Sequence, residues 1–122
     1  MSRLSSLILL LLLIGALPGC EVLSLDEDEV SAHSIGEVLF ITNTTSARIY
    51  YFAVGRETAA HINWAPHLDR EKSVDKGAAV RIRHKDIYRS ETEQEAIVFW
   101  WHAVERDVQR EPGEIQSLVV GL

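Results

Sequence analysis

The chain has 122 residues, with 12 basic and 18 acidic side chains and a formal net charge of −6, which leaves room for one small domain. The acidic balance excludes the clustered basic surface that a nucleic-acid-binding protein needs. A single cysteine excludes an intramolecular disulfide framework, so the folded domain must be held by packing alone.

The first segment of the chain has the pattern of a secretory signal peptide. Arg3 supplies a positive charge near the start, and residues 7–14 read LILLLLLI. Even counted from Leu4 to Leu17, the apolar stretch is shorter than the roughly 20 residues that span a bilayer as a helix. We therefore predict a cleaved signal peptide over residues 1–19.

The segment ends in Leu17-Pro18-Gly19-Cys20, which resembles the lipobox of bacterial lipoproteins. The resemblance implies transfer of a diacylglyceryl group to the Cys20 thiol, cleavage after Gly19 and acylation of the new amino terminus. The expected lipid anchors the protein to a membrane, and no other cofactor is expected. Glu21 rather than Asp follows the cysteine, which implies the outer membrane if the organism has two. The alternatives are cleavage at another bond, which leaves Cys20 as a free thiol, or an uncleaved anchor.

Residues 20–35 are predicted to be the lipidated cysteine and an acidic tether. Residues 26–29 read DEDE, and no sustained apolar period follows them. Like charges in such a run repel one another and favour a solvated spacer. The folded domain is therefore expected over residues 36–122.

From residue 36 onward the sequence is typical of short β-strands. β-branched and aromatic runs are bounded by turn residues, and Pro112-Gly113 predicts a turn before the last strand. Residues 58–64 fit either a strand or a helical turn, and residues 65–77 fit a long loop. Residues 96–104 are apolar on both faces, which favours a central strand. The predicted strands cover residues 36–43, 47–55, 78–85, 96–104 and 114–121.

About six short strands and no amphipathic helix predict an all-β protein, namely a small antiparallel β-sandwich. An immunoglobulin-like Greek key is the first prediction and a small β-barrel is the alternative. The stretches YYFAV, INWAP and WWH resemble small uncharacterised exported bacterial domains, a likeness that implies no particular activity.

Histidines suggest a metal site. His61, His67, Asp69 and His102 are the candidate ligands for zinc or copper, and His33 and His84 complete the histidine set. The chain has no HxH or HExxH spacing and no cysteine pair, so only the fold could assemble the site. The alternative is that these histidines are scattered over loops or hydrogen-bonded inside the domain.

Two adjacent tryptophans suggest a partner surface. Trp100 and Trp101 must point to opposite faces of a strand, so both cannot enter one core. Trp64 could cover the second ring, and an exposed tryptophan beside Tyr50 or Tyr51 would suit a protein or carbohydrate. The alternative is that both rings are buried, the second beneath the 65–77 loop.

A row of basic residues is the remaining candidate surface. Arg81, Arg83 and Lys85 alternate with Val80, Ile82 and His84, so the cations share one face. This row could meet an acidic partner or an anionic glycan. It could also be a solvated face paired with carboxylates such as Glu57 or Glu114.

Enzyme motifs are absent from the sequence, which contains no G-x-S-x-G elbow and no phosphate-binding loop. Asn43-Thr44-Thr45 matches a glycosylation sequon, which the bacterial origin implied by the lipobox resemblance makes incidental. We therefore expect a non-catalytic binding or structural module of the cell envelope, with an envelope protein as its candidate partner. The alternative is a metal- or small-ligand-binding envelope protein that uses the histidine and aspartate set.

Overall fold

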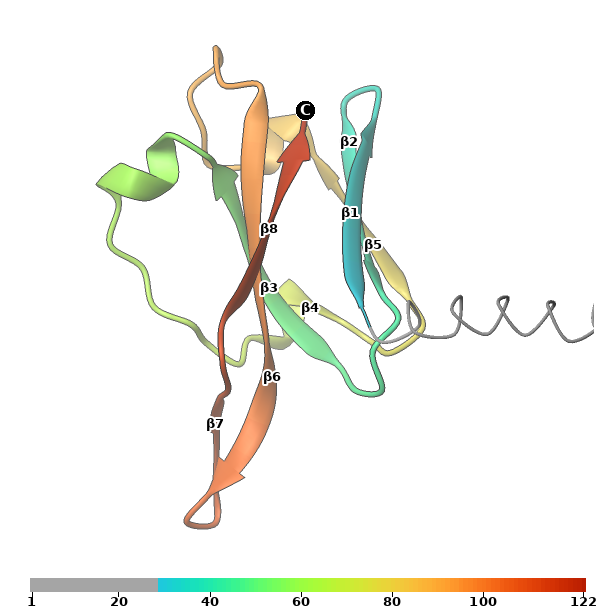
Figure 1. The fold of residues 1–122 in the computed structure, drawn as a ribbon, viewed down its shortest axis with the longest axis vertical. Coiled ribbons are helices and arrows are strands. Elements are labelled where there is room, and N and C mark those ends of the chain that lie inside the picture. The colour runs from blue at the N-terminus through green and yellow to red at the C-terminus, as the bar shows by residue number, and fades with distance from the viewer. Residues whose placement is uncertain (1–28) are drawn as a thin grey trace, which may run out of the picture.

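The computed structural model describes residues 29–122, which form two antiparallel β-sheets (Figure 1). The three-stranded sheet contains β1 (Val30–Ile35), β2 (Val38–Asn43) and β5 (Ala79–Arg83). The five-stranded sheet contains β3 (Ile49–Gly55), β4 (Ser73–Val74), β6 (Glu95–Arg106), β7 (Gln109–Pro112) and β8 (Gln116–Gly121). Within residues 29–122, three short 3-10 turns lie in the connections: η2 (Thr58–His61), η3 (Arg70–Lys72) and η4 (His84–Asp86).

The three-stranded sheet shows the two-residue alternation expected of a strand with one buried face. On β2, the side chains of Leu39, Ile41 and Asn43 point inward and are fully buried. On the outward face, the His33 ring stacks on Phe40 with a centroid distance of 5.3 Å. Arg81 of β5 lies directly across from Phe40 on that same outward face.

Strand β6 is the centre of the second sheet. Its first half pairs with β3 on one side and β8 on the other, while its second half pairs with β7. Between β7 and β8, residues 113–115 lie opposite Trp101 and His102, so the chain carries one extra residue, a β-bulge. The β6–β7 hairpin therefore extends past the body of the sandwich (Figure 1).

The strand order is that of an immunoglobulin-like sandwich. The order β1-β2-β5 corresponds to strands A-B-E, and β3-β6-β8 corresponds to C-F-G. The two-residue β4 pairs with β3 and takes the place of C′. Among the described residues neither sheet closes into a barrel, so the predicted all-β sandwich is confirmed.

The core lies between the two sheets. Leu39 and Ile41 of β2 pack in the same cluster as Ile49 of β3 and Val98 of β6, and all four side chains are fully buried. Both edges of β6 are paired along its first half, so the prediction of a central strand over residues 96–104 is confirmed. This core is what fixes the position of the opposite, outward face of β3 and β6.

The start of the domain was predicted wrongly. Residues 30–35 form β1, paired with β2 over its whole length, and Val30 is buried in the core. They therefore belong to the sandwich rather than to the tether of residues 20–35. The acidic run before them hid the strand because Val30, Ala32 and Ser34 supply only a weak apolar alternation.

The last turn was also predicted wrongly. The chain reverses at Asp107 and Val108, whose φ angles are 54° and 61°. Pro112 instead ends β7, and Gly113 lies in the bulge, where its N–H donates to the carbonyl of His102 at 2.7 Å. A valine at a positive φ gives no sequence signal of a turn, whereas Pro-Gly gives a strong one.

Within residues 29–122, no helix has the length and apolar character needed to cross a membrane. The predicted signal peptide and the lipobox at Cys20 lie outside the described residues.

Candidate functional site

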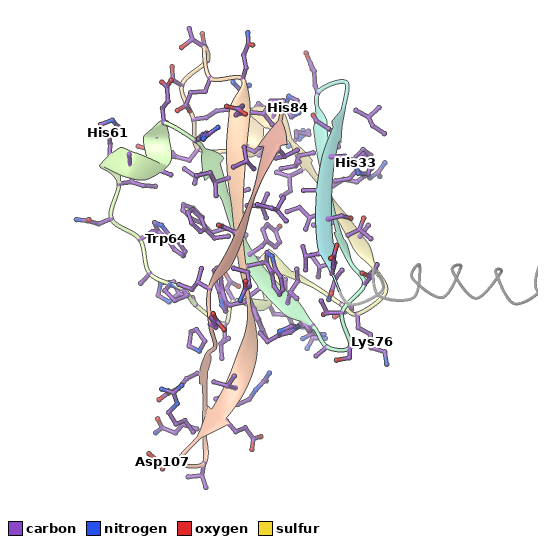
Figure 2. The ribbon with its side chains drawn as sticks, in the orientation of Figure 1. His33, His61, Trp64, Lys76, His84 and Asp107 are labelled. Atoms are coloured by element: carbon purple, nitrogen blue, oxygen red, sulfur yellow. The ribbon has the colours of Figure 1, made fainter. Side chains whose placement is uncertain are left out.

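The outward face of the five-stranded sheet carries aromatic side chains rather than a solvated surface. Phe52 of β3 and Phe99 of β6 are direct cross-strand partners. Trp64, from the connection between β3 and β4, packs over both rings with centroid distances of 4.9 Å and 4.7 Å. The connection therefore forms a second apolar layer on this side of the sheet, and Figure 2 shows Trp64 on it.

Trp101 fixes this connection to the sheet. Its ring is 3% exposed and lies 5.8 Å from the Trp64 ring, centroid to centroid. Its indole N–H donates a hydrogen bond to the carbonyl of His67 at 2.9 Å. No regular structure covers residues 62–69, so this bond and the packing of Trp64 hold the segment in place.

A pocket of about 360 Å³ opens beside Trp64 at the edge of β3. Its lining contains Phe52, Trp64 and Trp101 from the outward face and Tyr51, which also packs in the core, and its rim contains Ala65, His67, Asp69 and Lys72. The location follows from the sheet order, because within residues 29–122 this edge of β3 pairs with β4 at Ile49 and Tyr50 and with Tyr88 at Val54, which leaves the edge between them without a strand partner. A volume of this size, with aromatic walls and a few polar groups, is typical of a small-ligand site.

A larger recess of about 570 Å³ lies beside Arg56 and residues 92–95. Arg56 and Glu95 already pair across it at 3.0 Å, and its lining contains no aromatic residue. Volume alone does not make a site, and the smaller aromatic pocket has the lining that binds organic ligands.

The electrostatics of the aromatic pocket depend on Asp69, Lys72 and Tyr51. Burial raises the pKa of the Tyr51 hydroxyl above its usual 10, and the negative charge of Asp69 raises it further. The Tyr51 hydroxyl is protonated near neutral pH, as an unshifted tyrosine would also be, and the raised pKa keeps it so at higher pH. Asp69 begins the η3 turn, where one carboxylate oxygen accepts the N–H of Glu71 at 3.0 Å. The opening of the pocket thus carries the acidic side chain of Asp69, the basic side chain of Lys72 and the neutral hydroxyl of Tyr51.

The four candidate metal ligands do not converge. Within residues 29–122, no group of three or more His, Cys, Asp or Glu side chains is placed to hold a metal ion. His67 and Asp69 line the aromatic pocket, and His61 is exposed on η2. His102 follows Trp101 on β6 and therefore points to the opposite face, where its Nε2 lies 3.0 Å from Oγ1 of Thr45.

The two adjacent tryptophans lie on opposite faces of β6, as the alternation requires. Trp100 packs against the core, edge-on to the His102 ring at 5.5 Å. Trp101 lies beneath the Trp64 segment. Of the predicted partner surface, the structure thus brings Trp64 and Trp101 together and separates Trp100 from them.

The predicted basic row is only partly regular. Arg81 and Arg83 are exposed on the outer face of β5, but the strand ends at Arg83 and Lys85 belongs to η4. Arg83 pairs locally with Asp86 at 2.9 Å rather than with Glu57 or Glu114. His84 is buried, and its Nε2 lies 2.5 Å from Oγ of Ser34.

Sequence reasoning missed Phe52 and Lys72 as parts of the site. Phe52 could have been found, because it lies two residues after Tyr50 on the same strand, and residues two apart on a strand face the same side. Lys72 gave no local signal, because its place depends on how the long connection returns to the sheet. Asn43 of the sequon is fully buried, so its amide is not available for glycosylation in the folded domain.

The fold and pocket define an immunoglobulin-like sandwich with an aromatic recess on the outward face of one sheet. Comparison with protein-family models, with curated proteins and with solved structures found no match for the chain.

Proposed function

We propose that this chain is a lipid-anchored protein of the bacterial cell envelope and that its sandwich is a non-catalytic binding module. The observation that carries the binding role is the aromatic pocket beside Trp64. The sandwich core does not need this second aromatic layer, because the inward face of β3 and β6 already packs on the other sheet. Aromatic side chains gathered at a recess are the groups that anchor partners and ligands.

The anchoring part of the proposal rests on Leu17-Pro18-Gly19-Cys20 and on the apolar run before it. Acyl chains on Cys20 would hold the protein at the membrane, since each buried methylene contributes about 0.8 kcal/mol. The net charge of −6 gives no added attraction to anionic lipid, so the domain would stand away from the surface.

The anchor is tested with Cys20→Ala in the producing bacterium. The unaltered protein should take up labelled palmitate and sediment with membranes, and the variant should do neither. Palmitate label that persists in the variant would overturn the assignment of Cys20.

The binding role is tested in living cells with a photo-crosslinking residue at Ala65, which lines the pocket and is exposed. Lys76 is the matched control, since it is exposed on the turn before β5 and lies far from Trp64 in Figure 2. A discrete adduct at position 65 that is absent at position 76, and is lost in Trp64→Ala, is the expected result. Equal labelling at both positions, or none at either, would contradict a binding surface at the pocket.

A further inference from the structure

We infer that the pocket beside Trp64 binds a neutral saccharide. This inference rests on the proposed function, because it names a ligand class for the same site. Its elements are an aromatic wall, a rim whose charges cancel, and a mixture of hydrogen-bond donors and acceptors around one opening.

The aromatic wall suits one side of a sugar ring. Trp64 and Phe52 pack with a centroid distance of 4.9 Å, and Trp64 stays partly exposed while Trp101 is buried beneath it. The face of an aromatic ring carries partial negative charge, and the C–H groups on one face of a pyranose are apolar and weakly positive. A sugar ring can therefore lie against this wall with its hydroxyls directed to the rim.

The charges of the rim favour a neutral ligand. Asp69 and Lys72 both line the pocket, and within residues 29–122 neither forms an ion pair with any side chain. An anion would meet the Asp69 carboxylate and a cation would meet the Lys72 ammonium, so neither sign of charge is selected. Hydroxyl groups suit both side chains, because each hydroxyl both donates and accepts a hydrogen bond.

Other polar groups at the opening extend this pattern. The Tyr51 hydroxyl is a neutral donor near neutral pH, as for any tyrosine, and burial and then the charge of Asp69 raise its pKa further. The His67 side chain lines the opening while its carbonyl is held by the indole of Trp101. Donors and acceptors are therefore fixed on rigid neighbours, which reduces the ordering cost when a ligand binds.

Tryptophan fluorescence of the protein as isolated from the producing bacterium, in a detergent without a sugar headgroup, tests the inference. The probes are neutral glucose and N-acetylglucosamine oligomers, compared with a uronic-acid oligomer and with a hydrophobic peptide. Neutral saccharides should give a saturable change in emission, because Trp64 and Trp101 line the pocket. The uronic-acid oligomer should gain no affinity over the neutral saccharides, since the Asp69 carboxylate repels its charge while the Lys72 ammonium attracts it.

Matched variants locate the response. Asp69→Asn and Lys72→Gln should each weaken saccharide binding about tenfold, the effect of losing one charge-assisted hydrogen bond. Asp69→Asn preserves the start of η3, since asparagine also accepts a hydrogen bond there. Asp107→Asn and Lys76→Gln make the same chemical changes at positions remote from Trp64 (Figure 2) and should leave binding unchanged. Unfolding midpoints confirm that each variant is folded.

A folded protein whose emission no neutral saccharide changes would overturn the inference. Saturable binding of the peptide alone would also overturn it, while leaving the binding module intact. The proposed function has its own test in the crosslink at Ala65, so the two failures are distinguishable. Weakening by Lys76→Gln equal to that by Lys72→Gln would likewise count against the pocket.

Discussion

Oγ1 of Thr45 lies 3.0 Å from Nε2 of His102, and this contact ties the connection after β2 to the centre of the opposite sheet. The same hydroxyl donates to Oδ1 of Asn43 at 2.6 Å. Asn43 in turn donates to the carbonyls of Ala47 and Val74, at 2.9 Å and 3.0 Å. A fully buried amide is tolerable only when its donors and acceptors are satisfied, so this network fixes how the two sheets meet at this end.

Thr45→Val is expected to lower the free energy of unfolding by about 1 to 3 kcal/mol, because it leaves the buried Oδ1 of Asn43 with one partner fewer. Urea unfolding measures the change. Thr42→Val on the outer face of β2 is the control and should change stability by less than about 0.5 kcal/mol. Equal losses in the two variants would mean that the network adds nothing specific.

Glu93 is expected to make stability depend on pH in the acid range. Burial by itself raises the pKa of this carboxyl, but hydrogen bonds from Thr58 and Ser90 outweigh it and hold the pKa below the usual 4.5. Folding therefore favours the carboxylate, and its contribution is complete above about pH 4.5. That contribution is lost as the pH falls through the lower pKa of the folded state.

The matching variant is Glu93→Gln, which cannot titrate. Its unfolding midpoint should fall less steeply than that of the unaltered protein between about pH 5 and pH 3. Glu91→Gln removes an exposed carboxyl nearby and should keep the original slope. Parallel pH curves for Glu93→Gln and the unaltered protein would refute the role of Glu93.

Val108→Gly is expected to stabilise the protein by about 0.5 to 1 kcal/mol. The residue has a φ of 61° and a fully exposed side chain at the hairpin tip, so glycine removes backbone strain and sacrifices little packing. Val119→Gly makes the same change within the regular strand β8 and should destabilise by about 1 kcal/mol. Thermal unfolding distinguishes the two, and a loss of stability in both would contradict strain at the tip.

Trp101→Phe is expected to loosen the Trp64 connection more than it destabilises the domain. The variant keeps an aromatic ring but loses the hydrogen bond to His67, which costs about 1 kcal/mol. Amide hydrogen exchange should therefore speed up selectively over residues 62–69. Trp100→Phe alters the opposite face and should not produce this selective change. Unaltered exchange over residues 62–69 in Trp101→Phe would show that Trp64 alone holds the segment.

The strands and the sandwich could be predicted because their signals are local. Residues 78–85 alternate, 96–104 are apolar on both faces, and the structure has strands β5 and β6 there. The helical-turn option for 58–64 is realised as η2. Strand β1 could not be predicted with the same rule, because its inward residues are small or polar and gain their burial from β2.

The candidate site could be predicted only in pieces. Trp100 and Trp101 are adjacent on one strand and must therefore point to opposite faces. This correctly predicts that one ring packs against the core, as Trp100 does, and that the other lies on the outward face, as Trp101 does. No local sequence pattern indicates that Trp64 packs on Phe52 and Phe99, because these contacts join separate segments of the chain. The same limit applies to His67 and His102, which lie on opposite sides of β6.

The sequence by itself determined the all-β class, most of the strands and the face to which each side chain of a strand points, because a two-residue alternation is a property of the strand alone. The tertiary structure decided which strands are neighbours, where Trp64 and Lys72 return to the sheet, and that Asn43 is buried. These depend on sheet order and on the path of a long connection. Many weak contacts between distant residues set that path, and no local pattern encodes it.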